Sequence, residues 1–141
     1  MPVNPYLTFN GNCREAIEYY ADVFRLPGPE PMTFGQVPPE EGSTIPPEMK
    51  DLVMHAHLNI HGTPVLFSDA FPQSPVVFGK NVTLAITSDD LDRLHKEFAA
   101  LSKGGRVIMD FQKTFFSPAY GVVEDKFGVE WQFSYDDGSV R

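Results

Sequence analysis

The sequence holds one cysteine, Cys13, in 141 residues, and no run of apolar residues approaches the length of a membrane span. A single cysteine cannot form an internal disulfide, and it excludes a cysteine-rich zinc site. The N-terminal residues lack a basic region followed by an apolar one, so we expect no signal peptide. These absences predict a protein of the reducing cytoplasm that has no membrane partner.

Positive charge is also scarce, because 11 Lys and Arg residues face 19 Asp and Glu residues and give a net charge of −8. Such a chain repels phosphate backbones, so we expect no nucleic-acid partner. The sequence contains no glycine-rich phosphate loop, no dinucleotide fingerprint and no nucleophile elbow, which excludes the enzyme classes that depend on them.

Apolar residues make up 42% of the chain, enough for the core of a single domain over residues 1–141. Residues 5–9 read as a strand, and apolar residues at helical spacing predict a helix over about 13–24. Asn12 is the expected N-cap, with Glu15 three residues on as in a capping box.

A proline-rich stretch follows, with seven of the 13 prolines between residues 27 and 47 and a short strand expected at 32–34. Residues 54–60 then alternate strictly between apolar and polar side chains, which predicts a half-buried strand. His61 and Gly62 turn the chain into a strand over 64–68.

The same order of elements returns after a linker at residues 71–79. We expect a strand over 82–87, a helix capped by Ser88 or Asp89 and stopped by Gly104 and Gly105, and three strands over 106–109, 117–123 and 129–135. A polar tail, 137–141, ends the chain. The repeated order, with helix starts about 76 residues apart, indicates a duplication rather than a repeat array.

The fold class is therefore α+β. It consists of two tandem βαβββ modules, about 1–70 and 80–136, that form a curved, half-open sheet with helices on its outer face.

Three segments carry a family resemblance: residues 6–13 with the helix end Tyr19-Tyr20, residues 67–70 (Phe-Ser-Asp-Ala), and residues 125–131. With the βαβββ-βαβββ order, they make the chain similar to the PhnB-like family of the vicinal-oxygen-chelate superfamily. That superfamily includes glyoxalase I, bleomycin-resistance proteins and extradiol dioxygenases. The family is also labelled demethylubiquinone-methyltransferase-like, but the chain has no glycine-rich strand-turn-helix of the kind a methyl donor site needs.

The resemblance also implies where a divalent metal would sit, because metal-dependent members take one ligand from each of four strands. Those positions fall on Pro5, near Phe67 with Asp69 two residues later, between Asn81 and Thr83, and on Gln132. Proline has no ligand atom, and an amide is a weak substitute for a carboxylate. The resemblance therefore implies no cofactor at the usual four-ligand site.

His55 and His57 are two residues apart, so both side chains lie on one face of the predicted strand. They are candidates to line a ligand cavity, to ligate a metal with Gln132, or to be partly buried polar residues bonded to neighbours. Met32, Phe34 and the proline-rich stretch fit either a lid or a plain surface loop.

Gln132 alternates with Trp131 and Phe133, so it points into the concave face if those two rings pack under a helix. Phe115, Phe116 and Trp131, with Tyr120, fit an aromatic wall for a flat ligand, and they equally fit a core or a dimer contact.

Three further residues have a structural and a chemical interpretation. Asp69 and Asp125 each suit a carboxylate that bonds loop or turn backbone, which we favour over a catalytic role. Cys13 at a helix N-terminus is expected to have a lowered thiol pKa, although no base partner is near in the sequence.

Three functions remain open at this point. The first is a small-molecule binding protein without the usual metal site, in which His55, His57, Gln132, Phe115, Phe116 and Trp131 contact the ligand. The second is a metal-dependent lyase or isomerase that uses His55, His57 and Gln132. The third is a non-catalytic interaction module. We expect a homodimer in each case, because βαβββ modules expose sheet edges.

Overall fold

The computed structural model describes residues 2–38 and 45–139, and the chain divides into two compact units, Met1–Val77 and Phe78–Arg141. Part of the proline-rich stretch, 39–44, and the end of the polar tail, 140–141, lie outside the described residues. Among the residues described, no helix combines the length and the apolar character that crossing a bilayer requires.

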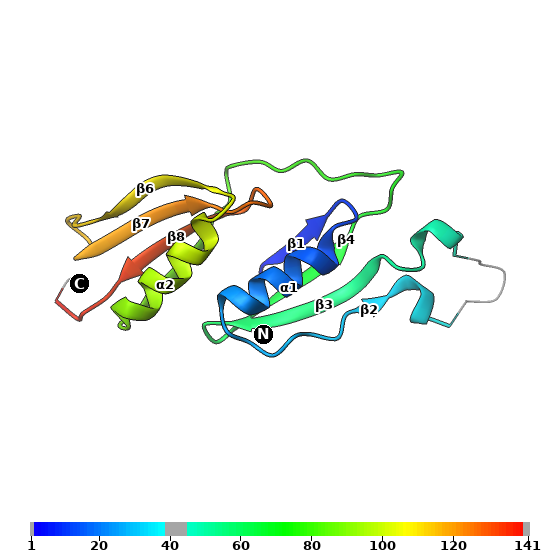
Figure 1. Cartoon of the computed structure of the whole chain (residues 1–141), viewed down its shortest axis with the longest axis horizontal. Helices are drawn as coiled ribbons and strands as arrows, with labels where there is room; N and C mark the ends of the chain where they lie inside the picture. The colour runs from blue at the N-terminus through cyan, green and yellow to red at the C-terminus, as the bar shows by residue number, and fades with distance from the viewer. Residues whose placement is uncertain (1, 39–44, 140–141) are drawn as a thin grey trace. The chain divides into compact units, whose positions relative to one another are not determined.

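In its described residues, unit one contains one α-helix and an open four-stranded sheet (Figure 1). Its elements run in the order β1 (Tyr6–Phe9), α1 (Cys13–Val23), β2 (Met32–Thr33), β3 (Val53–Ile60) and β4 (Thr63–Asp69), with 3₁₀ turns at Phe34–Gln36 and Pro47–Met49. The strands bond in the order β1-β4-β3-β2, with β1 parallel to β4 and the other pairs antiparallel.

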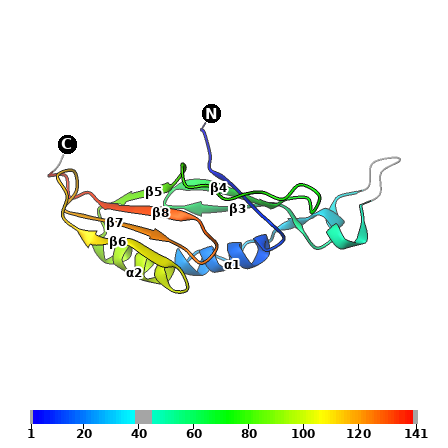
Figure 2. The ribbon, with the colours of Figure 1, turned by 90° about the horizontal axis from the view of Figure 1, so that it is seen from above.

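Unit two repeats this connectivity. Its elements are β5 (Leu84–Ser88), α2 (Leu91–Ser102), β6 (Arg106–Gln112), β7 (Ala119–Glu124) and β8 (Glu130–Tyr135). The strand order is β5-β8-β7-β6, with β5 parallel to β8. In each unit the helix lies along its own sheet (Figure 2). The predictions of an α+β fold and of two tandem βαβββ modules are therefore confirmed.

The core of unit one lies between α1 and the sheet, because the apolar stripe of the helix meets the apolar face of β1, β3 and β4. The Tyr20 ring stacks on Phe67 at 5.9 Å, and Phe67 stacks on Phe9 at 6.4 Å. Each of these side chains is at most 1% exposed. Burying a side chain of this size stabilises the fold by about 1.5–3 kcal/mol.

The core of unit two follows the same plan around α2. Leu94, Phe98 and Leu101 repeat at helical spacing and are buried. Phe98 meets Phe133 of β8 edge-on at 5.6 Å, an arrangement that aromatic rings favour.

The hairpin between β3 and β4 turns at the two predicted residues, His61 and Gly62, whose φ angles are 48° and 84°. A two-residue turn needs positive φ at both positions to match the twist of the strands it joins. Glycine adopts that backbone readily, whereas His61 bears some strain.

The predicted N-cap position of α1 is confirmed, but its capping bond is not, and α2 begins after a different cap residue from those predicted. Asn12 occupies the N-cap of α1, but its side chain makes no capping bond. Oδ1 of Asp69 instead accepts hydrogen bonds from the N–H groups of Gly11 (2.9 Å) and Cys13 (3.0 Å). Asp90, not Ser88 or Asp89, caps α2, because its Oδ1 accepts a bond from the N–H of Arg93.

Candidate functional site

The two histidines of β3 share the open face of the unit-one sheet, as predicted. Their neighbours Ala56 and Leu58 are each 4% exposed, whereas His55, His57 and Asn59 are exposed, because successive strand residues point to opposite faces. The two imidazole rings lie 6.4 Å apart between centroids. A single ligand of ordinary size can therefore contact both.

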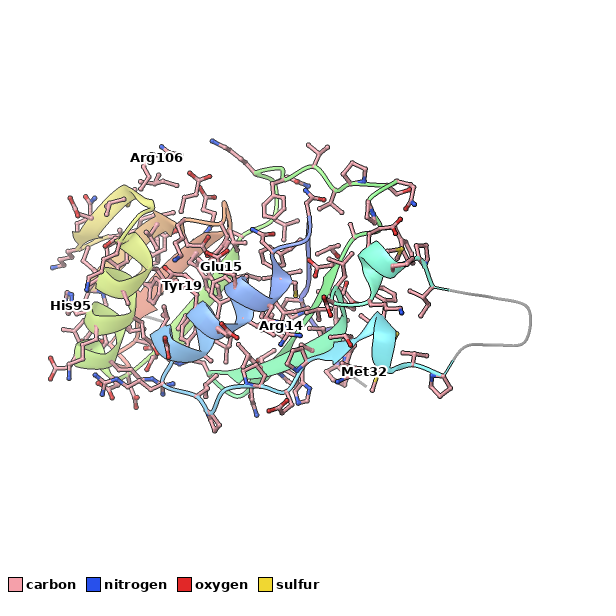
Figure 3. All side chains as sticks on the ribbon, turned by 45° about the vertical axis from the view of Figure 1, so that its right-hand side comes forward. Arg14, Glu15, Tyr19, Met32, His95 and Arg106 are labelled. Carbon is pink, nitrogen blue, oxygen red and sulfur yellow. The ribbon has the colours of Figure 1, made fainter. Side chains whose placement is uncertain are left out.

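A hollow of about 380 Å³ lies beside these histidines at the outer edge of β3. The other wall of the hollow consists of residues 26–30, a segment after α1 that we call the strap, and of Met32 of β2. Met32 is labelled in Figure 3. Pairing between β2 and β3 begins only at Met32, opposite His55. Pro27 and Pro29 fix φ and lack an N–H, so the strap does not continue the strand and the edge stays open.

The main chain of His57 faces this hollow. Leu66, which lies opposite His57 in the β3–β4 pair, donates its N–H to the carbonyl of Pro5, toward β1. Leu66 and His57 therefore form a non-hydrogen-bonded pair, in which the backbone groups of each residue point away from the partner strand, so the N–H and C=O of His57 point away from β4. The hollow therefore offers peptide groups as well as two imidazoles.

In unit two, Gln132 lies at the centre of a side-chain network. The hydroxyl of Tyr120 donates to Oε1 of Gln132 at 2.8 Å, and Nε2 of Gln132 donates to Oγ1 of Thr83 at 2.9 Å. Sequence reasoning selected Gln132 but missed the two bonds that orient its amide. The alternation of side chains along β7 and β8 could have indicated that Tyr120 and Gln132 lie on the same face. The contact with Thr83 depends instead on how β5 pairs with β8.

An aromatic group borders the network. The Phe116 ring meets Tyr120 edge-on at 4.9 Å, and Phe115 meets Phe116 at 5.2 Å. Phe115 is 93% exposed and Phe116 44%, so both offer apolar surface to an incoming molecule.

Trp131 lies elsewhere, in the core of unit two. It is 1% exposed, and its Nε1 donates to Oδ2 of Asp125 at 2.9 Å. Strand alternation puts it on the face of Phe133, which packs on α2, and not on the face of Gln132.

The phenol of Tyr120 has a raised pKa. Burial is the larger cause, because it disfavours the phenolate, and the negative charge of Glu130 adds to it. Tyr120 therefore stays protonated as a hydrogen-bond donor throughout the neutral range.

Asp69 and Asp125 both bond backbone N–H groups, as the sequence favoured. The partners of Asp69 do not lie in its own loop, as expected, but in other segments. Its Oδ2 accepts a bond from the N–H of Val53 at 2.9 Å, so this carboxylate joins β3 to the N-terminus of α1. Asp125 does bond its own turn, through the N–H groups of Phe127 and Val129.

The prediction of a lowered thiol pKa for Cys13 is wrong. The side chain is fully buried, and burial, with a smaller contribution from the Asp69 charge, raises the pKa of the thiol to about 12. Desolvation outweighs the helix N-terminus here, so Cys13 is an inert core residue.

The residues at the expected metal positions do not fit a divalent ion. Pro5 has no donor, Phe67 lies in the core, and both oxygens of Asp69 already accept backbone bonds. Both amide atoms of Gln132 are bonded to side chains. Within residues 2–38 and 45–139, no group of three or more His, Cys, Asp and Glu side chains is arranged to hold a metal.

Comparison with known proteins gives consistent matches along the chain. The model of the 3-demethylubiquinone-9 3-methyltransferase family matches residues 2–134. Protein YjdN of Escherichia coli (strain K12) is 31% identical over 140 residues, 95% of each chain.

Two solved structures extend these matches to the fold. Protein PA1353 from Pseudomonas aeruginosa is 32% identical, with a TM-score of 0.78 over 96% of this chain and 97% of its own. A putative 3-demethylubiquinone-9 3-methyltransferase, PhnB protein, from Bacillus cereus is 22% identical, with a TM-score of 0.72 over 96% and 99%. The latter likeness is one of fold.

The two open βαβββ modules in tandem have the fold that the sequence resemblance implied, that of the vicinal-oxygen-chelate superfamily, and the fosfomycin resistance protein FosX from Listeria monocytogenes shares this fold at 8% identity with a TM-score of 0.56. The chain belongs to the 3-demethylubiquinone-9 3-methyltransferase family, which is the PhnB-like family of the sequence resemblance.

Proposed function

We propose that this chain is a small-molecule binding protein of the glyoxalase and bleomycin-resistance type that holds its ligand without a resident metal. The observation that carries the proposal is the hollow of about 380 Å³ beside His55 and His57. Pockets of 300–1,000 Å³ with a few convergent polar groups suit small organic ligands.

The ligand we propose is flat and amphipathic. On unit one, the imidazoles and the main chain of His57 supply hydrogen bonds, while Met32 and the prolines of the strap supply apolar surface. Unit two carries a separate surface of its own, where we assign Gln132 to polar contact and Phe115 and Phe116 to stacking with a ligand. Gln132 keeps one amide hydrogen and one lone pair beyond its two bonds, enough for one donor and one acceptor contact with a ligand.

The test is an NMR titration of the labelled, chelator-treated protein with a library of aromatic fragments. We expect fragments whose saturable shifts include the amides of His55, His57 and Asn59. Charge reversal by His55→Glu should weaken these fragments at least tenfold and leave stability within about 0.5 kcal/mol, because the side chain is exposed.

His95→Glu is the matched control, since His95 is an exposed histidine on α2, in the other unit (Figure 3). It should leave fragment affinity unchanged. The proposal fails if no fragment shifts the β3 amides, or if both variants weaken binding equally.

A second function, self-association, is favoured by the apolar surface of unit two. Besides Phe115 and Phe116, the β6 residues Val107, Ile108 and Met109 are 36–41% exposed. Exposed large apolar side chains on one unit favour an interaction surface. We propose a homodimer that uses it, and light scattering at micromolar concentration tests this, with a mass near 15.8 kDa as the contrary result.

A further inference from the structure

A separate hollow of about 400 Å³ lies in unit one at the carboxyl ends of β1 and β4. These two strands are parallel, and the chain leaves both at this end, through Asn10 and Gly11 after β1 and through Ala70 and Phe71 after β4. Ligands of open α/β sheets commonly bind beyond the carboxyl ends of parallel strands. The histidines of β3 are not among its lining residues.

Backbone and side-chain bonds hold the walls of this hollow in place. The Asn10 side chain pairs with the peptide of Val76, donating from Nδ2 to its carbonyl (3.0 Å) and accepting from its N–H at Oδ1 (2.9 Å). The N–H of Ala70 donates to the carbonyl of Phe9 at 2.7 Å, and that of Ser74 to the carbonyl of Phe71 at 2.8 Å. The loop over 70–76 is therefore fixed before any ligand binds.

The lining is mostly apolar, and beside it stand the polar Asn10 and the charged Glu48. Leu52, Ala70, Phe71, Pro72 and Pro75 supply the apolar surface. Phe71 is 52% exposed and is positioned by a ring contact with Phe34 at 5.5 Å. Glu48 is the one charged residue of the lining, and no ion pair satisfies its carboxylate within the described part of the chain.

We propose that this hollow binds a small organic amine whose apolar or aromatic body packs on Phe71 and Pro72 while its ammonium group faces Glu48. The carboxylate selects a cation, and the apolar walls exclude a hydrated metal ion. The Phe71 ring also attracts an ammonium group placed over its face. The net charge of −8 raises the local concentration of cations around the chain.

The probe is benzylamine, with the isosteric but uncharged benzyl alcohol and the anionic benzoate as companions. Each is titrated into the labelled full chain at low salt, and amide shifts are followed by NMR. We expect benzylamine to shift the amides of Asn10, Gly11, Ala70 and Phe71 saturably. Benzyl alcohol should bind about 2- to 5-fold more weakly, the range for one exposed charge pair, and benzoate more weakly still.

Two substitutions separate charge from shape. Glu48→Gln should lower benzylamine affinity about 2- to 5-fold without changing that of benzyl alcohol, while Glu18→Gln, at an exposed glutamate of α1, should change neither. Ala70→Leu fills part of the hollow, so it should weaken both probes.

The proposal is overturned if benzylamine produces no saturable shift at these amides, or if Glu48→Gln leaves the preference for benzylamine over benzyl alcohol unchanged. The outcome is independent of the proposed function, because His55→Glu should leave benzylamine binding intact. A change in benzylamine affinity in that variant, most directly a gain from the new carboxylate, would place the amine beside the histidines and contradict a separate site.

Discussion

Tyr120 and Gln132 are joined by a hydrogen bond of 2.8 Å between the phenol hydroxyl and Oε1 of the amide, across the β7–β8 pair. The bond fixes which amide atom points toward β7, and Thr83 completes the arrangement from the other side. Gln132 is thus oriented before a ligand arrives, which lowers the entropy lost on binding.

The variant Tyr120→Phe removes the donor and keeps the ring. We expect a loss of about 0.5–1.5 kcal/mol in the free energy of unfolding, the usual net value of one hydrogen bond, measured by urea denaturation. Tyr6→Phe, at a half-exposed tyrosine of β1, is the control and should be neutral. Equal effects of the two substitutions would mean that the Tyr120 bond adds no stability.

The variant Glu130→Gln tests the electrostatics of the same face. The carboxylate of Glu130 opposes ionisation of Tyr120, so removing its charge should lower the pKa of the phenol. The pKa is read from the ultraviolet titration of the protein after subtraction of the Tyr120→Phe curve. An unchanged pKa would show that burial alone accounts for the shift.

Asp69→Ala should be strongly destabilising. The substitution leaves the N–H groups of Gly11, Cys13 and Val53 without their carboxylate, and two of these bonds are buried. An unsatisfied buried donor costs about 1–3 kcal/mol, so we expect a loss of about 3 kcal/mol or more in urea unfolding. Asp51→Ala, at an exposed aspartate, should change stability by less than about 0.5 kcal/mol. A small effect at Asp69 would refute its role in linking β3 to α1.

Cys13 should make stability fall in alkaline solution. The thiol ionises near pH 9.0 in the unfolded chain and near pH 12 in the folded one, so between these values the unfolded state binds fewer protons. Stability is unaffected below pH 9 and decreases as the pH rises above it. Between pH 8 and pH 10, the wild type should lose about 1 kcal/mol more than Cys13→Ala in urea unfolding. Parallel losses would contradict the raised pKa.

Sequence reasoning succeeded where the signal was local. The alternation around His55 and His57 and the helical spacing of Leu94, Phe98 and Leu101 each arise from a few neighbouring residues, and the structure confirms both. Duplication of the βαβββ order also followed from these local patterns.

Contacts between distant residues were beyond such reasoning. Asp69 caps a helix that begins 56 residues earlier, and Thr83 meets Gln132 across 49 residues. The pKa of Cys13 was predicted in the wrong direction because helix position can be read from the sequence, whereas burial beside Asp69 cannot. The width of the hollow beside β3 depends on the distance between the strap and that strand, and no local sequence pattern determines this distance.

A thermal-shift screen of small molecules and of zinc, nickel and manganese ions on chelator-treated protein tests the central claim most directly. A ligand present at a hundred times its dissociation constant adds about 2.7 kcal/mol, which raises the Tm of a domain of this size by several degrees. We predict that flat, amphipathic molecules produce this rise without any metal, that His55→Ala and His57→Ala abolish it, and that the ions alone leave Tm unchanged. A rise that requires one bound ion per chain, lost in both histidine variants, would contradict the account and favour a metal-dependent enzyme.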